Sequence, residues 1–207
     1  MEGRSALYLG LLSVIGIAVT AQASDVSDHN QRPVFCGDND CPKYQLVKQY
    51  EGFEHRKYDA TQWISTSVLA GKQSINIGFW NIFQYFNGSN SAGLKMKPTV
   101  PLVIMVPGNQ TVNLTMSAFL SESLKNPPKP LKSTLSLHKY PEASLYVRSF
   151  GGFASKEDFA THISALAEEL TTLDLPFDDS FVACNIYDPP EKRSDRHNEV
   201  WLLAIKK

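Results

Sequence analysis

The 207-residue sequence has no block of basic residues and no clear excess of charge of one sign. It contains 20 Lys and Arg and 21 Asp and Glu, which gives a formal net charge of −1. Proteins that bind the backbone of a nucleic acid need clustered cations to neutralise several phosphates. The balanced charge therefore argues against nucleic acid as a partner.

The sequence also lacks the short motifs of common catalytic sites. It has no G-x-S-x-G turn for a nucleophilic serine, no H-E-x-x-H zinc motif and no glycine-rich phosphate loop. His138, His162 and His197 have no second ligand type at a spacing useful for a metal. We therefore expect a binding protein and not an enzyme.

No apolar run in the sequence is long enough to cross a bilayer, which takes about 20 residues. Residues 7–19 form an apolar run of thirteen residues, and the small-x-small triplet Ala21-Gln22-Ala23 follows it. This pattern predicts a signal peptide over residues 1–23 and a secreted, extracellular chain that begins at Ser24. The alternative for this run is a buried or amphipathic helix.

Cysteine is scarce, with three residues in the chain. Cys36 and Cys41 enclose the polar turn sequence of residues 37–40, and export would place them in an oxidising compartment. We predict a Cys36–Cys41 disulfide, whose short loop limits its contribution to stability. The alternative is a metal site that would include His29. Cys184 lies in an apolar run, which predicts a buried and unreactive thiol.

The sequence holds three N-x-S/T sequons, which begin at Asn87, Asn109 and Asn113. Each falls where a turn or a solvent-facing strand position is expected. Behind a signal peptide such sequons are acceptors for N-linked glycans, so we predict glycosylation at all three.

Two segments show the spacing of helices, and the rest of the chain favours strands. Apolar and aromatic residues recur at helical spacing over residues 74–86, and Ser155 is a good N-cap for a second helix over residues 155–173. Residues 126–130 contain three prolines and predict a connector. The expected strands cover residues 44–50, 53–58, 63–69, 100–106, 113–120, 134–140, 145–150, 180–187 and 199–205.

These elements give the order β-β-α-β-β twice, which predicts a duplicated domain. The tripeptides Arg56-Lys57-Tyr58 and Arg148-Ser149-Phe150 stand at comparable places in the two halves. We expect an N-terminal arm over residues 24–43 and one α+β domain over residues 44–207. In this domain two helices cover a mostly antiparallel, curved sheet that forms a distorted β-barrel of two pseudo-symmetric halves.

Several segments resemble the SOUL/haem-binding protein family, and the resemblance covers residues 44–206. The segments that carry it are LYVRSFGGF at 145–153, YDPP at 187–190, RHNEVWL at 196–202, WISTSV at 63–68 and KMKPTVP at 95–101. The resemblance implies a distorted barrel with a hydrophobic groove beside the first helix that takes haem or another tetrapyrrole. It implies no catalysis. The export signal and the cysteine pair place this chain with the secreted members.

Haem binding requires an apolar slot, and the first helix carries Phe79, Trp80 and Phe83 together with Tyr85 and Phe86. These aromatic residues cover more than one face of the helix, which packing on a sheet does not require. We therefore predict that Phe79, Trp80 and Phe83 line the groove. The alternative is that all five rings belong to the core.

Cationic side chains near the slot would bind the two haem propionates, and we predict Arg56, Lys57 and Lys72 for this role. Each of them is alternatively a solvated surface charge. One branch of the family has a proposed axial histidine at the position of Lys57, and His55 shares that strand face, so His55 is our candidate iron ligand. Alternatively it is a structural or surface histidine.

We expect the chain to act as a haem carrier or scavenger. The alternative function is a binding module for another amphipathic small molecule or for a protein partner. The sequence gives no signal for the oligomeric state.

Overall fold

The computed structural model describes residues 32–108 and 113–205. The predicted signal peptide, the first eight residues of the N-terminal arm and the sequon at Asn109 lie outside the described residues. Within the described part, the elements in chain order are η1 (Val34–Cys36), β1 (Tyr44–Gln49), β2 (Glu54–Tyr58), β3 (Thr61–Leu69), α1 (Lys72–Phe86), β4 (Leu102–Pro107), β5 (Asn113–Leu120), β6 (Leu135–Tyr140), β7 (Ala143–Phe150), α2 (Lys156–Thr172), β8 (Phe177–Ile186) and β9 (Asn198–Ala204).

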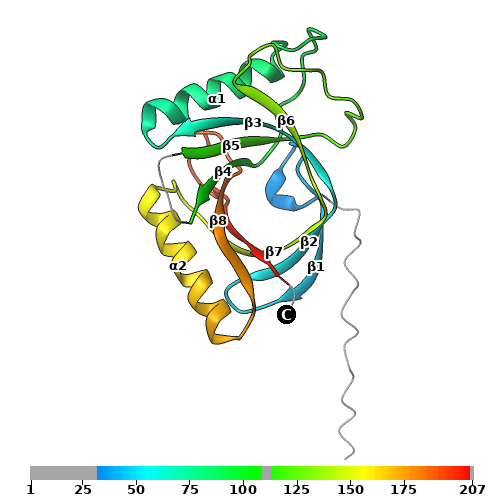
Figure 1. Ribbon diagram of the computed structural model, residues 1–207. Helices are drawn as coiled ribbons and strands as arrows, with labels where there is room; N and C mark the ends of the chain where they lie inside the picture. Colours follow the sequence, from blue (N-terminus) through cyan, green and yellow to red (C-terminus); the bar gives the residue numbers. More distant parts are fainter. Residues whose placement is uncertain (1–31, 109–112, 206–207) are drawn as a thin grey trace, which may run out of the picture.

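The strands form one antiparallel sheet in the order β1-β2-β7-β9-β8-β4-β5-β3-β6. The sheet curls on itself without closing, and α1 and α2 pack on its outer side (Figure 1). The α+β class, the strands and helices, and the distorted antiparallel barrel are therefore as predicted. In the strands under the helices, β3, β5, β7, β8 and β9, the two-residue alternation turns one face to a helix and the other to the interior.

The strand order confirms the internal duplication, with β2-β3-α1-β4-β5 repeated as β6-β7-α2-β8-β9. The central pair is β8 and β4, and the first strand of each half pairs with the second strand of the other half. The equivalence predicted between Arg56 and Arg148 is wrong, because Arg56 lies in β2 whereas Arg148 lies in β7. β2 corresponds in the duplication to β6, and β7 corresponds to β3.

Helix α1 covers β3 and β5 and is held by a core beneath it. Its buried side chains Ile82, Tyr85 and Phe86 pack with apolar residues of these strands. Gly78 permits the close approach, since a Cβ atom at this position would lie 2.5 Å from Cγ1 of Val68.

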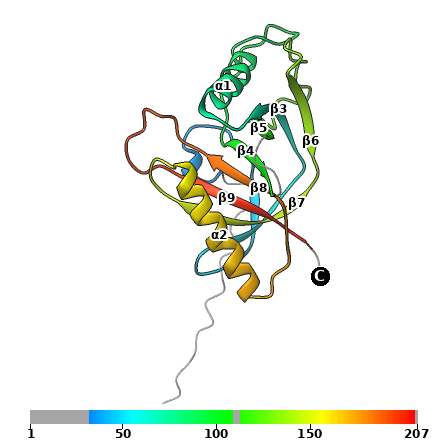
Figure 2. The same ribbon diagram turned by 60° about the vertical axis from the view of Figure 1, so that its left-hand side comes forward.

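Helix α2 covers β7, β8 and β9 on the same outer side of the sheet (Figure 2). Its predicted N-cap is confirmed, because the Ser155 side chain accepts a hydrogen bond from the Asp158 backbone N–H. The Asp158 carboxylate accepts one from the Ser155 backbone N–H in return, which completes a capping box. Beneath the helix, Phe159, Leu166 and Leu170 pack into a second core.

Candidate functional site

Three aromatic side chains of α1 are large, apolar and exposed. Phe79 is 41 %, Trp80 55 % and Phe83 39 % exposed. Their rings contact one another, with centroids 5.7 Å apart for Phe79 and Trp80 and 5.3 Å apart for Trp80 and Phe83. The alternative that all five rings are core is wrong, because only Tyr85 and Phe86 are buried. A contiguous apolar patch of this kind is typical of a binding surface.

The second helix shows that the architecture does not require these rings. When α1 and α2 are aligned at their first residues, Trp80 corresponds to Ser164 and Phe83 corresponds to Ala167. Two buried positions coincide in the same alignment, Ile82 with Leu166 and Phe86 with Leu170, whereas Phe79 corresponds to the partly buried Ile163. The exposed rings of α1 are therefore an addition to a shared packing pattern.

The positively charged Lys72 lies at the N-terminal end of the same side of α1. Lys72 is the first residue of α1, and Phe79 and Phe83 follow at i+7 and i+11, so the three residues share one row. The N-cap, Gly71, makes no side-chain hydrogen bond to the helix, and the first turn contains no acidic residue. The positive end of the helix dipole and Lys72 therefore favour an anion there.

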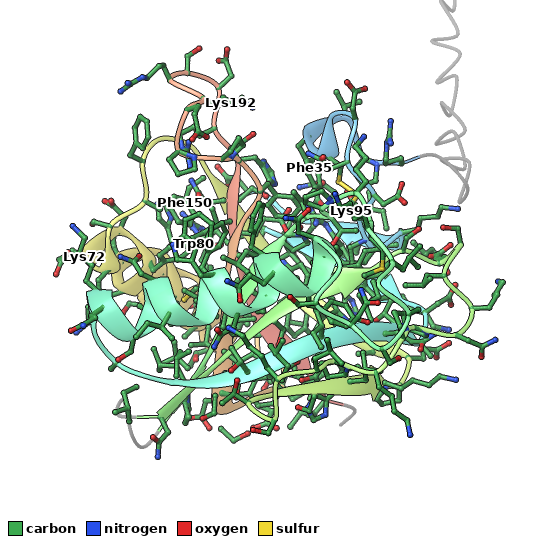
Figure 3. All side chains as sticks on the ribbon, turned by 90° about the horizontal axis from the view of Figure 1, so that it is seen from above. Phe35, Lys72, Trp80, Lys95, Phe150 and Lys192 are labelled. Carbon is green, nitrogen blue, oxygen red and sulfur yellow. A yellow bond between two sulfur atoms is a disulfide. The ribbon has the colours of Figure 1, made fainter. Side chains whose placement is uncertain are left out.

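We call this surface, formed by Lys72, Phe79, Trp80 and Phe83, the α1 flank. Figure 3 shows Lys72 at one end of α1 and Trp80 near its middle. In that view Trp80 lies on the side of the helix turned toward Phe150 and the loop that carries Lys192.

The structure does not bring the other two predicted cations to the α1 flank. Both lie in β2, which pairs with β1 and β7, whereas α1 packs on β3 and β5. Lys57 forms a surface ion pair with Glu142 at 3.0 Å. Arg56 is only 2 % exposed, so the prediction that it reaches a ligand propionate does not hold.

His55 also lies away from the α1 flank. It is in β2, and its ring packs on Tyr146 of β7 with centroids 4.9 Å apart, beside the core of α2. Its Nε2 atom is buried and has no hydrogen-bond partner among the described residues. Burial lowers the pKa of His55, so the neutral ring is favoured. The described residues also contain no cluster of three His, Cys, Asp or Glu that could hold a metal.

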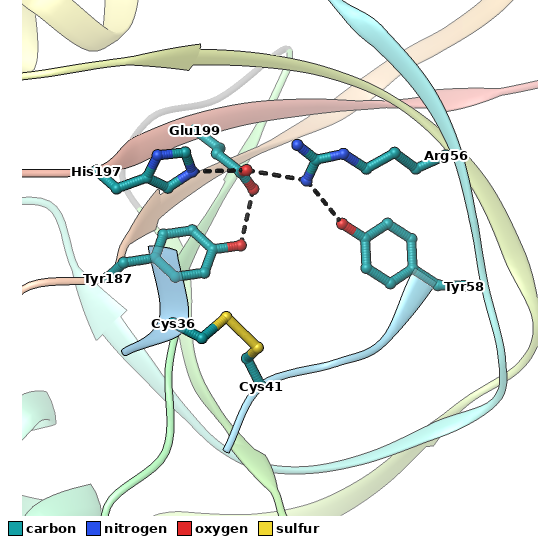
Figure 4. The surroundings of a disulfide bond; sticks show 7 residues. All are labelled: Cys36, Cys41, Arg56, Tyr58, Tyr187, His197 and Glu199. Atoms are coloured by element: carbon teal, nitrogen blue, oxygen red, sulfur yellow. Dashed lines mark hydrogen bonds and ion pairs between the residues drawn. A yellow bond between two sulfur atoms is a disulfide. The ribbon is translucent and has the colours of Figure 1, made fainter. Parts of the chain in front are cut away.

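Arg56 instead forms a buried ion pair inside the curved sheet (Figure 4). Its Nη1 donates to Oε1 of Glu199 at 2.9 Å and to the Tyr58 hydroxyl at 3.2 Å. Glu199 is fully buried and also accepts hydrogen bonds from the Tyr187 hydroxyl and from Nε1 of Trp201, each at 2.7 Å. We call these five residues the Glu199 network.

Opposing effects act on the Glu199 carboxyl. Burial raises its pKa, but the charge of Arg56 and the hydrogen bonds from His197 and Tyr187 outweigh burial and lower the pKa to about 2. Burial also raises the pKa of the Tyr58 hydroxyl, which therefore stays protonated. Nε of Arg56 also donates to the partly exposed Glu54 carboxylate at 2.5 Å, so Arg56 has two counter-charges and the polar atoms of the network are satisfied by neighbouring groups.

The predicted disulfide is present and helps to close one end of the interior. Cys36 and Cys41 are bonded, with Cα atoms 6.3 Å apart. The bond lies close to the Glu199 network (Figure 4), and the ring of Phe35, the residue before Cys36, stacks on His197 at a centroid distance of 4.0 Å. The third cysteine, Cys184, is buried as predicted, and burial raises the pKa of its thiol to about 12.

A cavity of about 370 Å³ lies inside the curved sheet, beside the Glu199 network. We call it the interior cavity. Sequence reasoning missed it, because alternation marks the inward side chains of a strand but not whether they fill the space between them. Its described lining residues are Pro42, Tyr58, Asp59, Thr61, Trp63, Val103, Met105, Ser117, Tyr140, Pro141, Ala143, Leu145, Phe181, Ala183, Trp201 and Leu203.

The two sequons within the described part lie at the surface. Asn87 is the exposed C-cap of α1, and Asn113 is the exposed first residue of β5. Both amides are therefore accessible, and their glycosylation stays a prediction. None of the described helices combines the length and apolar character needed to span a bilayer.

Known proteins resemble this chain in both sequence and fold. A family model described as SOUL heme-binding protein matches residues 39–203. Human heme-binding protein 2 is 33 % identical over 158 residues, covering 73 % of this chain and 77 % of the relative. Heme-binding protein 1 of Xenopus laevis is 31 % identical over 159 residues, covering 73 % of this chain and 83 % of the relative.

More distant solved structures share the fold alone. The C-terminal domain of EcmrR superposes with a TM-score of 0.56 at 8 % identity, covering 79 % of this chain and 99 % of that domain. A hydrolase from Listeria innocua superposes with a TM-score of 0.51 at 10 % identity, covering 77 % of this chain and 94 % of that chain. The match of the family model over most of the described residues and the agreement with two named relatives lead to one conclusion: the chain belongs to the SOUL haem-binding protein family.

Proposed function

We propose that this protein binds haem or a related tetrapyrrole on the α1 flank, and that it does so outside the cell as a carrier or scavenger. The observation that supports the site is the set of three exposed, mutually contacting rings that the equivalent helix α2 lacks. The names of the relatives describe binding proteins, so we propose a binding role and not catalysis.

The residues of the α1 flank fit the chemistry of haem, a flat apolar macrocycle with two carboxylates. Phe79, Trp80 and Phe83 provide apolar surface for the macrocycle, and Lys72 with the N-terminus of α1 provides positive charge for a propionate. Bound haem would supply an iron centre. His55 is not part of this proposal, because its ring packs on Tyr146 near α2.

Titration of the purified protein with haemin tests the proposal. We expect a shifted Soret band and quenched emission from Trp80. Trp80→Ala should weaken binding by about 10-fold or more, since burying a large apolar side chain contributes about 1.5–3 kcal/mol. Lys72→Ala should weaken it by about 1.5- to 5-fold, as expected for an exposed charge pair of about 0.2–1 kcal/mol.

Two variants on α2 provide matched controls. Lys156→Ala removes the first residue of α2, the counterpart of Lys72, and Leu173→Ala removes an exposed apolar side chain at the end of that helix. Both should leave haemin affinity unchanged. Equal losses from Lys156→Ala and Lys72→Ala, or an unchanged affinity in Trp80→Ala, would show that the α1 flank is not the site.

Export and glycosylation are tested separately from binding. The exposure of Asn87 and Asn113 supports glycan attachment at these two positions. Expression in cells with a secretory pathway should release a chain that begins at Ser24 and carries glycans removable by an amidase. A chain retained inside the cells with residues 1–23 attached would contradict the proposed location.

A further inference from the structure

We propose a second binding site in the interior cavity, for an uncharged apolar small molecule. This site is distinct from the α1 flank in position, because the helices pack on the outer side of the sheet whereas the cavity lies on its inner side. The two sites also differ in charge, because the α1 flank contains Lys72 whereas the described lining of the cavity contains no Lys, Arg or His. Charged and uncharged ligands can therefore distinguish them by experiment.

The size and lining of the cavity are those of a ligand site. Its volume of about 370 Å³ lies within the range of about 300–1,000 Å³ typical of small-molecule pockets. It is more than twice the roughly 150 Å³ of an apolar cavity that takes up benzene. The cavity is partly open to the surface, so a ligand has a route into it.

Aromatic rings form much of the wall. Tyr58 and Trp201 contact each other with centroids 5.3 Å apart, and Trp63 contacts Tyr140 at 6.4 Å. Phe181 of β8 adds a further ring to the lining. Flat apolar faces of this kind suit a molecule with rings or a short aliphatic body.

The polar atoms of the wall are almost all occupied by protein partners. Nε1 of Trp63 donates to the Thr61 hydroxyl at 2.8 Å, and the Ser117 hydroxyl is paired with that of Ser65 at 2.8 Å. Tyr58 and Trp201 are held by the Glu199 network. The Tyr140 hydroxyl differs, because it points at the Met105 sulfur at 3.8 Å, which is a weak acceptor. It is therefore able to bind one polar group of a ligand.

The charge of the lining excludes an anionic ligand. The described lining residues include no Lys, Arg or His, and Asp59, which is exposed at the surface, is the one charged side chain among them. A carboxylate or sulfonate placed there would lose its hydration without gaining a cation. Haem propionates and fatty acids are thus disfavoured in the cavity, whereas an uncharged molecule meets no such cost.

The tryptophans of the chain report on the two sites separately. Trp63 and Trp201 line the interior cavity, and Trp80, the third of the three, lies on the α1 flank. The variant Trp80→Phe therefore leaves only the cavity reporters. It also retains an aromatic ring on α1.

The test uses two probes that differ by one charge, N-phenyl-1-naphthylamine and its sulfonated analogue 8-anilinonaphthalene-1-sulfonate. With the Trp80→Phe protein we expect the uncharged probe to bind at one site, with quenching of Trp63 and Trp201 and a rise in probe emission. The sulfonated probe should bind at least about 10-fold more weakly. Equal affinity of the two probes, or no saturable binding of the uncharged probe, would overturn the proposal.

Variants that fill the space locate the bound probe. Ala183→Phe puts a ring into the wall on β8, and Ala143→Phe does so at a half-buried position at the start of β7 that tolerates a larger side chain more easily. We expect a loss of about 10-fold or more in affinity for the uncharged probe and no change in haemin affinity. Unchanged probe binding in a folded Ala143→Phe protein would place the probe elsewhere and refute the assignment.

Discussion

Replacement of Glu199 by Gln removes the buried negative charge and preserves the shape of the side chain. The Arg56 guanidinium, 2.9 Å away and 2 % exposed, would then keep only its second counter-charge, the partly exposed Glu54 carboxylate. Breaking a buried pair by removing one partner costs about 3–5 kcal/mol. Because Glu54 still offsets part of the Arg56 charge, we expect Glu199→Gln to lower the free energy of unfolding by about 3 kcal/mol at pH 7, the lower end of this range.

The pKa of Glu199 gives the same magnitude and fixes its pH dependence. The fall from an ordinary value of 4.5 to about 2 corresponds to about 3 kcal/mol of folding free energy. Because the pKa is lower in the folded protein, this contribution is complete above the unfolded value and is lost as the pH falls toward 2. At pH 3 the difference between wild type and Glu199→Gln should shrink to about 1 kcal/mol.

Urea denaturation at pH 7 and at pH 3, followed by tryptophan emission, measures both values. Glu142→Gln is the control, because Glu142 forms an exposed ion pair with Lys57 worth at most about 1 kcal/mol. A loss below about 1 kcal/mol for Glu199→Gln at pH 7, or an equal loss at both pH values, would refute the account of the Glu199 network as a stabilising buried pair.

Two further predictions concern stability. The Cys36→Ser/Cys41→Ser protein should lose about 2 kcal/mol of unfolding free energy, because the bonded cysteines are only five positions apart and close a short loop. Urea denaturation with and without reductant measures this loss, and an unchanged free energy of unfolding would contradict the prediction. Gly78→Ala should destabilise by about 1–3 kcal/mol, because the new Cβ would meet Val68, although Ala is the better helix former. Asn76→Ala, at an exposed position of the same helix, should be neutral or stabilising, and a gain in Gly78→Ala would show that the contact relaxes.

The elements and their order follow from local signals in the sequence. Helical spacing over residues 74–86 and the N-cap at Ser155 depend on neighbours within one or two turns. The Cys36–Cys41 bond joins residues separated by five positions, so its turn could be recognised without the fold. The duplication was also predicted from the sequence, because the order β-β-α-β-β occurs twice. The equivalent strands were assigned wrongly, because the additional strand β1 gives three strands before α1 in the first half but only two before α2 in the second half.

What the sequence by itself determined was therefore the alternation of faces, the helices, the short disulfide loop and the family. Tertiary structure alone decided which side chains those faces bury. It paired Arg56 with Glu199 across 143 positions, left the rings of α1 exposed, separated His55 from them and formed the interior cavity. The physical reason is that burial and charge pairing depend on which distant strands become neighbours, and one strand's pattern does not contain that information.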